Sequence, residues 1–139
     1  MGNIKDFFIK NKDYSIPIIR VSLALVLLWF GIDEIINPEN WFGYIPSWLT
    51  SILPLDIGTF IIINGIFEVI VGFLLLIGLH TRIIAFIAAL HLLSITIAVG
   101  YNDIAVRDFG LTLMAVSLIF SGAGIFSLDN KKLKNSKIK

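Results

Sequence analysis

The sequence predicts an all-α fold, an integral membrane four-helix bundle in which the helices run up-down-up-down and both termini lie in the cytoplasm. The first observation behind this prediction is composition, because 57% of the 139 residues are hydrophobic, whereas about 45–50% is usual in soluble domains. The second is that the apolar residues form four long runs, each near the roughly 20 residues that cross a bilayer as a helix. The third is the uneven placement of lysine and arginine, which indicates how the helices are oriented.

The predicted spans cover residues 16–36, 57–77, 82–100 and 104–120. Asn37-Pro38 stops the first span, because proline cannot continue a helix. Gly78 is expected to end the second span and Thr81 to cap the third, while the fourth can extend toward Phe126. Because the connection between the second and third spans is so short, these two spans must form an antiparallel hairpin.

Basic residues gather on one side of these spans. That side carries Lys5, Lys10, Lys12, Arg20, Arg82 and the five lysines between Lys131 and Lys139. The positive-inside rule therefore predicts a cytoplasmic N-terminal segment over residues 1–15, a membrane domain over residues 16–126 and a basic cytoplasmic tail over residues 127–139. We expect this tail to be solvated and disordered rather than to bind nucleic acid.

The longest connection, residues 37–56, is expected outside the membrane and is rich in aromatic rings, among them Trp41 and Trp48. Within it, the stretch PSWLTSIL is expected to form a short helix that lies in the membrane interface. Two interpretations of the rings stay open. They form either an aromatic belt at the level of the lipid headgroups or a lid over a lipid-soluble substrate.

Glu68 lies near the middle of the second predicted span, where a carboxylate is costly. It shares a helix face with Gly65 and Gly72, and since small residues allow close helix contacts in lipid, Glu68 is expected to face protein. The third span carries a matching face of mostly small residues, on which His91 also lies. At about 1.5 Å per residue from the shared turn, Glu68 and His91 both lie roughly 14 Å deep, so they can meet across the hairpin. Asn64 lies one turn from Glu68.

The expected Glu68–His91 pair has two interpretations, and the sequence leaves both open. One is a structural hydrogen bond between helices, worth about 0.6–2 kcal/mol in a membrane bundle. The other is a proton relay or a quinone-contacting site, since ionisable groups inside a membrane are functional candidates. On the second interpretation, Glu68 and His91 are the candidate catalytic residues.

Other charged residues gather at the ends of the spans. Asp33 and Glu34 close the outer end of the first span, at the level of Arg107 and Asp108. We therefore expect an Asp33–Arg107 or a Glu34–Arg107 pair, which is either a structural clamp or an outer mouth for protons or a polar substrate. Arg20 lies about one turn inside the opposite face, where its side chain can reach inward or snorkel.

Several kinds of chemistry are excluded or weakened by the sequence. The chain has no cysteine, which excludes disulfides, c-type haem attachment and thiolate-ligated clusters. His80 and His91 differ in depth by roughly 16 Å, too much for both to ligate one haem. We predict no metal site, because Glu68 and His91 would need further ligands from a partner. A net charge of only +1 produces no strong field for nucleic acid.

Three stretches carry the motifs RVSLALVLLWFGIDEI, FEVIVGFLLLIGLHTRIIAFIAAL and VRDFGLTLMAVSLIFSGAGIFSLD, which fall within residues 20–129. The most specific parts are the series Glu68, Gly72, Gly78 and Arg82, followed by the terminal GAGIFSLD. In their order and spacing these motifs resemble the DoxX-like family of small four-helix membrane proteins. The resemblance therefore covers most of the chain.

The resemblance implies a four-helix bundle that is associated with membrane oxidoreductase systems. Some members are similar to the small subunit of a thiosulfate:quinone oxidoreductase, and others accompany redox or detoxification enzymes. Many members carry lysine three residues after the glycine that matches Gly31, where this chain has Glu34. This departure puts any role of that lysine in doubt for this chain.

The leading hypothesis is a multi-pass cell-membrane subunit of a quinone-linked oxidoreductase complex, with quinone as the candidate cofactor. Its expected partners are the lipid bilayer and either other membrane subunits or further copies of the chain. The buried Glu68–His91 pair forms the site, and candidate contacts to quinone or lipid come from Asn64, Arg20, Trp41 and Trp48. Two alternatives stay open: a non-catalytic accessory or assembly subunit of a larger enzyme, and a small proton or solute pathway.

Overall fold

The computed structural model describes residues 4, 6 and 11–136, without the side chains of residues 132, 134 and 136. Most of the predicted N-terminal segment lies outside the described residues, as do Lys5, Lys10, Lys137 and Lys139. The four long helices are α2 (Ser15–Ile36), α4 (Ile57–Ile77), α5 (Thr81–Val99) and α6 (Asp103–Ser121). Each is long and apolar enough to cross a membrane, and the described residues contain no strand. These helices confirm the four predicted spans.

The ends of the long helices follow from local residues. The carboxylate of Asp56 accepts a hydrogen bond from the N–H of Thr59 at 2.8 Å, which caps the start of α4. Asn102 caps α6 in the same way through the N–H of Ala105. The predicted extension of the fourth span toward Phe126 is wrong, because α6 ends at Ser121 and the backbone turns at Gly122 with φ 80°.

Short elements flank the long helices over residues 12–136. These are η1 (Lys12–Tyr14), η2 (Pro38–Tyr44), α3 (Ser47–Ile52) and α7 (Leu128–Ser136). α3 confirms the short helix expected within the loop over residues 37–56. The expectation of a disordered tail is wrong for α7, which Asp129 ties to the rest of the protein as described below.

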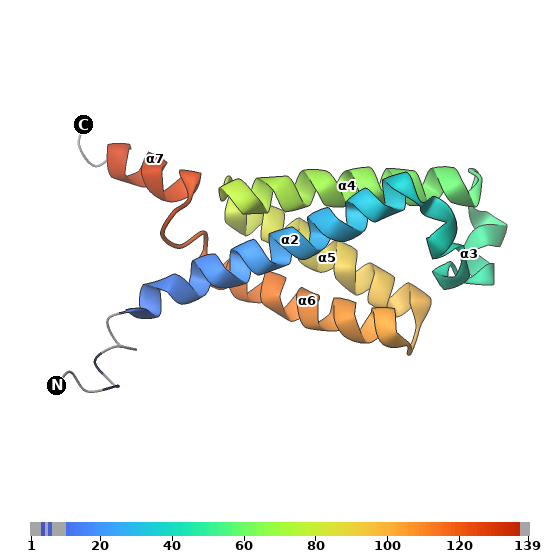
Figure 1. The fold of residues 1–139 in the computed structure, drawn as a ribbon, viewed down its shortest axis with the longest axis horizontal. Coiled ribbons are helices and arrows are strands. Elements are labelled where there is room, and N and C mark those ends of the chain that lie inside the picture. Colours follow the sequence, from blue (N-terminus) through green and yellow to red (C-terminus); the bar gives the residue numbers. More distant parts are fainter. Residues whose placement is uncertain (1–3, 5, 7–10, 137–139) are drawn as a thin grey trace.

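Successive long helices run in alternating directions, so α2 begins and α6 ends at the same end of the bundle (Figure 1). We call this the α7 end and the opposite end, where η2 and α3 lie, the α3 end. The closest packing joins α2 to α4 and α5 to α6. By contrast, α4 and α5 contact each other much less, although only Gly78–His80 connect them. The backbones of the two hairpin helices therefore lie less close together than those of the two tightly packed pairs.

The glycines of α4 form the contact with α2. A Cβ atom on Gly65 would lie 2.6 Å from the carbonyl oxygen of Gly31, and one on Gly31 would lie 2.7 Å from that of Gly65. Farther along, a Cβ on Gly72 would lie 3.0 Å from the carbonyl oxygen of Ala24. The expectation that these glycines face the small residues of α5 is therefore wrong, because α2 offers a matching groove at Gly31 and Ala24.

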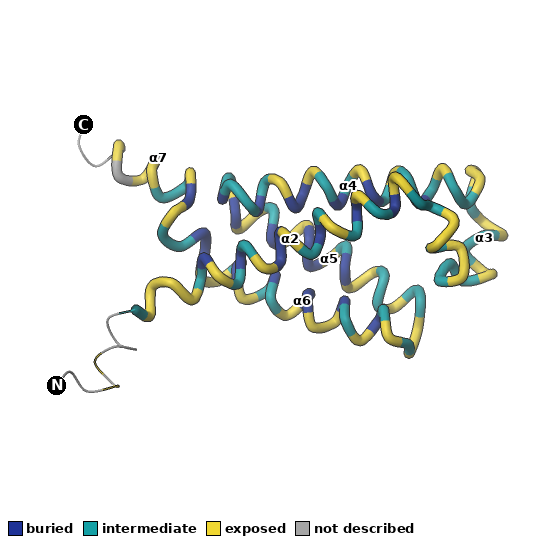
Figure 2. Tube along the Cα trace, viewed as in Figure 1, coloured by how far each residue is buried: buried dark blue, intermediate teal, exposed yellow. Residues whose placement is uncertain are grey.

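The core of the bundle is a continuous cluster of aliphatic side chains from all four long helices, including Leu27, Leu75, Leu92 and Leu118. Buried positions line the inside of the bundle, and exposed positions follow its outward faces (Figure 2). Many large apolar side chains are among the exposed ones, for example Phe73 and Phe86. An apolar outer surface of this kind fits burial in lipid.

Arg20 lies buried at the α7 end, with only 1% of its surface exposed. Its guanidinium donates hydrogen bonds to four backbone carbonyl oxygens, those of Leu75 (2.6 Å), Leu76 (2.6 Å), Ala123 (3.1 Å) and Phe126 (3.0 Å). The last turn of a helix leaves such carbonyls without intrahelical partners and carries partial negative charge. Arg20 thus joins the end of α4 to the segment that follows α6.

Asp129 fixes the start of α5 from the C-terminal side of the chain. Its two carboxylate oxygens accept hydrogen bonds from the N–H groups of His80 and Thr81, each at 2.8 Å. The expectation that Thr81 caps this helix is wrong, since the carboxylate of Asp129 takes that role. Through this contact, α7 is anchored to the turn between α4 and α5.

Candidate functional site

A cavity of about 330 Å³ lies at the α3 end of the bundle, with walls from α2, α4, α5 and α6. This volume falls within the roughly 300–1,000 Å³ typical of sites for small organic molecules. Most of its lining is apolar, and Tyr44, Pro46 and Leu49 contribute to the wall from η2, α3 and the residues between them. Seven polar side chains also line it: Glu34, Asn64, Glu68, His91, Ser94, Arg107 and Asp108.

Glu68 and His91 meet in the wall of this cavity, as the sequence predicts. Oε1 of Glu68 lies 3.2 Å from Nε2 of His91, and their side chains are 5% and 15% exposed. The ring of Phe67 packs against the imidazole with 4.6 Å between the ring centroids. α4 and α5 therefore hold a carboxyl and an imidazole in hydrogen-bond contact. Which of the two groups donates depends on the tautomer of the imidazole.

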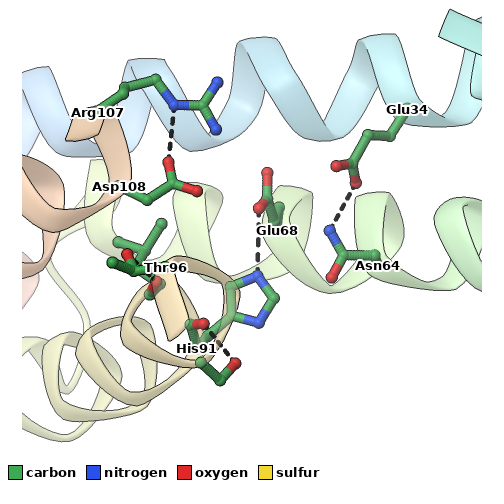
Figure 3. A network of polar contacts seen from close by, with 9 residues as sticks. Glu34, Asn64, Glu68, His91, Thr96, Arg107 and Asp108 are labelled. Carbon is green, nitrogen blue, oxygen red and sulfur yellow. Dashed lines mark hydrogen bonds and ion pairs between the residues drawn. The ribbon is translucent and has the colours of Figure 1, made fainter. Parts of the chain in front are cut away.

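Glu34 and Asn64 form a second polar contact, one helical turn from Glu68 toward the α3 end. Nδ2 of Asn64 donates a hydrogen bond to Oε2 of Glu34 at 2.8 Å. The close approach of α2 and α4 at Gly31 and Gly65 brings this pair together, since a Cβ on Gly65 would lie only 2.9 Å from the Cβ of Glu34. The carboxylate of Glu34 thus reaches the cavity from α2 (Figure 3).

Arg107 forms its ion pair with the neighbouring Asp108 rather than with a carboxylate of the first span. Nε of Arg107 donates to Oδ1 of Asp108 at 2.7 Å, and its guanidinium lies 3.9 Å from the centre of the Phe30 ring. The expectation of an Asp33–Arg107 or Glu34–Arg107 ion pair is therefore wrong. Asp33 instead accepts hydrogen bonds from the loop, and Glu34 turns to Asn64.

Asp33 holds the aromatic loop against the cavity. Its carboxylate accepts hydrogen bonds from Nδ2 of Asn37 at 2.8 Å and from Nε1 of Trp41 at 3.0 Å. The Trp41 ring also packs edge-on against Phe30, with 5.5 Å between centroids, and tilted against Tyr44. Because Trp41 and Tyr44 line the cavity, this part of the loop covers it.

The other predicted contacts to quinone or lipid lie in different places. Asn64 and Trp41 line the cavity together with Glu68 and His91, whereas Arg20 and Trp48 do not. Arg20 binds the carbonyl oxygen of Leu75, which is seven residues or about 10 Å along α4 from Glu68. Trp48 is 54% exposed on α3. The structure thus separates Arg20 and Trp48 from the Glu68–His91 pair.

Asp108 is the residue of the site that sequence reasoning undervalued, because it was placed only in a charge cluster at the ends of the spans. Its side chain is fully buried in the cavity wall. A signal was present, since Asp108 lies one turn inside α6, next to Arg107 and four residues before Thr112. Among the described residues, no group of three or more histidines and carboxylates is arranged to hold a metal ion.

Comparison with known families gives one match. The family model described as DoxX matches residues 15–101, which includes α2, α4 and α5 and ends just before α6. The chain belongs to the DoxX family, whose members are small membrane proteins. No curated protein and no solved structure matches the chain. The family and the four apolar helices together make this an integral membrane protein.

Proposed function

We propose that this protein is a cell-membrane subunit of a quinone-linked oxidoreductase complex and that the quinone ring binds in the cavity at the α3 end. The observation that carries the proposal is the Glu68–His91 contact in the wall of a largely apolar cavity inside a membrane bundle. A lipid-soluble ring needs apolar walls and a few placed polar groups. The limited packing of α4 against α5 leaves room for such a ring between the helices.

The chemistry assigned to the pair is proton transfer. Reduction of a quinone to a quinol takes up two electrons and two protons, and the electrons come from a dehydrogenase subunit of the complex. Oε1 of Glu68 and Nε2 of His91 are in hydrogen-bond contact, so a proton can pass between them, and the pair is the candidate proton donor to a quinone in the cavity. The Phe67 ring packs against the imidazole of His91 and keeps it in position.

The neighbouring carboxylates support a role in proton handling. Glu34, Glu68 and Asp108 are all buried, and they point into the same region between the helices (Figure 3). Several carboxyl groups that line one cavity provide positions along which a proton can pass. Glu34, nearest the α3 end, is the group placed to exchange protons with the water on that side.

The test is turnover of the complex with a short-chain benzoquinone after mild extraction from native membranes. We expect Glu68→Gln and His91→Gln each to lower turnover by about 100-fold, the scale of a lost general acid or base, while the subunits still co-purify. Glu39→Gln, at an exposed position of η2, is the matched control and should retain full turnover. Full turnover in both cavity variants would remove the proton-transfer role. Dissociation of the complex in both would favour an accessory role in assembly.

Binding can be measured separately from turnover. Trp41 lines the cavity, whereas Trp29 and Trp48 are 74% and 54% exposed and lie outside it. In a protein carrying Trp29→Phe and Trp48→Phe, a bound benzoquinone should quench the fluorescence of Trp41 in a saturable manner. A protein that keeps Trp48 and carries Trp29→Phe and Trp41→Phe should show only the unsaturable quenching caused by quinone dissolved in the lipid.

A further inference from the structure

Two polar atoms in the cavity wall have no hydrogen-bond partner among the described residues. They are Nη1 of Arg107 and Oδ2 of Asp108, and both atoms are buried. The Asp108 side chain is 0% exposed. Figure 3 shows its second oxygen turned away from Arg107, on the side of Glu68. Buried polar groups are nearly always hydrogen-bonded. We therefore expect a molecule bound in the cavity to provide the missing hydrogen-bond partner.

The chemistry of the two atoms defines that partner. Nη1 of Arg107 can only donate a hydrogen bond, and an ionised Asp108 can only accept one. The two atoms lie on different sides of the pair, because Nε of Arg107 donates to Oδ1 of Asp108 at 2.7 Å and Nη1 is on the edge of the guanidinium opposite to the Nε–H group. A carbonyl or ether oxygen of a ligand has no hydrogen to donate, so it would leave Oδ2 of Asp108 without a partner. A hydroxyl group satisfies Oδ2, since its O–H group donates to the carboxylate of Asp108.

We propose that Oδ2 of Asp108 binds a hydroxyl group of the cavity ligand, so that the ligand is a lipid-soluble phenol, with the quinol form preferred over the quinone. The proposal rests on the proposed function only for placing a quinone ring in this cavity. It adds a second polar contact, on α6, to the Glu68–His91 contact between α4 and α5. The guanidinium of Arg107 lies on the Phe30 ring. Its hydrogen bond to Oδ1 keeps the Asp108 carboxylate in position.

The experiment compares two redox-inert probes that differ in one hydrogen-bond donor. The full-length protein in phosphatidylcholine nanodiscs is titrated with para-hexylphenol and with its methyl ether, para-hexylanisole, after subtraction of binding to empty nanodiscs. The wild-type protein should bind the phenol about tenfold more tightly or better, as expected when a hydrogen bond to a buried charged group is gained. Equal affinity of the two probes for the wild-type protein would overturn the proposal.

Asp108→Asn makes the test specific to the atom. Nε of Arg107 needs an acceptor, so the amide oxygen of the new side chain stays at the position of Oδ1 and the amide N–H group faces the cavity. The acceptor for a phenol is then replaced by a donor, and the preference for the phenol should vanish or reverse toward the ether. Asp103→Asn, at an exposed position of α6 outside the cavity, should keep the wild-type preference. An unchanged preference in Asp108→Asn would also overturn the proposal.

This result is distinguishable from the test of the proposed function. A preference for the phenol, together with full quinone turnover in Glu68→Gln and His91→Gln, would keep the hydroxyl site and remove the proton-transfer role. Lost turnover in these variants without any preference between the probes would keep the proton-transfer role and remove the hydroxyl site.

Discussion

Charged side chains at the α7 end bind backbone groups at the ends of helices. The guanidinium of Arg20 takes carbonyl oxygens of the last turn of α4, and the carboxylate of Asp129 takes N–H groups at the start of α5. Both contacts match the partial charges of helix ends. Each charge also reaches across the sequence, so the two residues hold the C-terminal segment against the α4–α5 turn.

The Asp129 contact predicts a dependence of stability on pH. Partial burial raises the pKa of Asp129, but hydrogen bonds from the backbone N–H groups of Thr81 and His80 lower it by more, so its pKa lies below the ordinary value. A lowered pKa in the folded state means that the stabilisation is fully present above the unfolded pKa of about 3.9. It is lost as the pH falls through the folded pKa.

Asp129→Asn should therefore lower the thermal unfolding midpoint at neutral pH, measured in detergent. The gap from the wild-type protein should begin to narrow as the pH falls below about 4 and close below the lowered pKa of the folded state, where the wild-type carboxyl is also neutral. Asp13→Asn, at an exposed position near the same end, is the control and should leave the midpoint unchanged. A gap that stayed constant down to the lowest measurable pH would contradict the role given to the carboxylate.

At the scale of the elements, the arrangement of helix pairs produces the cavity. α4 packs closely on α2 through the contact of Gly31 and Gly65, and α5 packs closely on α6. The two pairs meet less tightly, and the loop over residues 37–56 covers the space between them at the α3 end. The glycine contact therefore matters for the site, since it positions both Glu34 and Glu68 in the wall.

Two glycine substitutions test this arrangement against helix propensity. Gly65→Ala would place a methyl group against the backbone of α2, so we expect it to lower the free energy of unfolding by about 1–3 kcal/mol or more. Gly110→Ala, in α6 with nothing within 4 Å of the new Cβ, should instead stabilise the protein by about 0.5–1 kcal/mol.

Both glycine variants are compared by thermal or denaturant unfolding in the same detergent. Gly65→Ala should also weaken quenching of Trp41 by benzoquinone, because the separation of α2 from α4 moves Glu34 and Glu68 apart. Similar stabilities for Gly65→Ala and Gly110→Ala would contradict the close contact between α2 and α4 at Gly65.

Across the whole molecule, basic and acidic residues separate to opposite ends. Lys12, Arg20, Arg82 and Lys131 lie at the α7 end, where α2 and α5 begin and α7 follows. The α3 end carries mostly carboxylates, with Arg107 among them. On the positive-inside rule, this distribution predicts that the α7 end faces the cytoplasm.

The absence of cysteine from the chain allows a direct test of this orientation. Ser51→Cys places a single thiol at an exposed position of α3, and Asn135→Cys places one at an exposed position of α7. A membrane-impermeant maleimide should label the first variant in intact cells and the second only after the membrane is permeabilised. The opposite pattern of labelling would invert the predicted topology.

The sequence predicted the number of spans, their bounds to within a few residues and the Glu68–His91 contact. These features depend on local rules, namely the length of apolar runs, helix-ending glycines and equal depth from a short turn. It did not predict that Arg107 pairs with Asp108, that Asp129 caps α5 or that α4 packs on α2. Each of these depends on which helix faces become neighbours, and several pairings place small residues in contact equally well.

The sequence by itself therefore determined a membrane protein with four helices and a buried carboxyl-imidazole pair, because the cost of exposing polar groups to lipid leaves few other outcomes. Only the tertiary structure decided that Glu34, Glu68, His91, Arg107 and Asp108 line one cavity. The physical reason is that these residues come from all four long helices. Their convergence depends on the close α2–α4 contact and the looser α4–α5 contact, and neither is encoded within any one span.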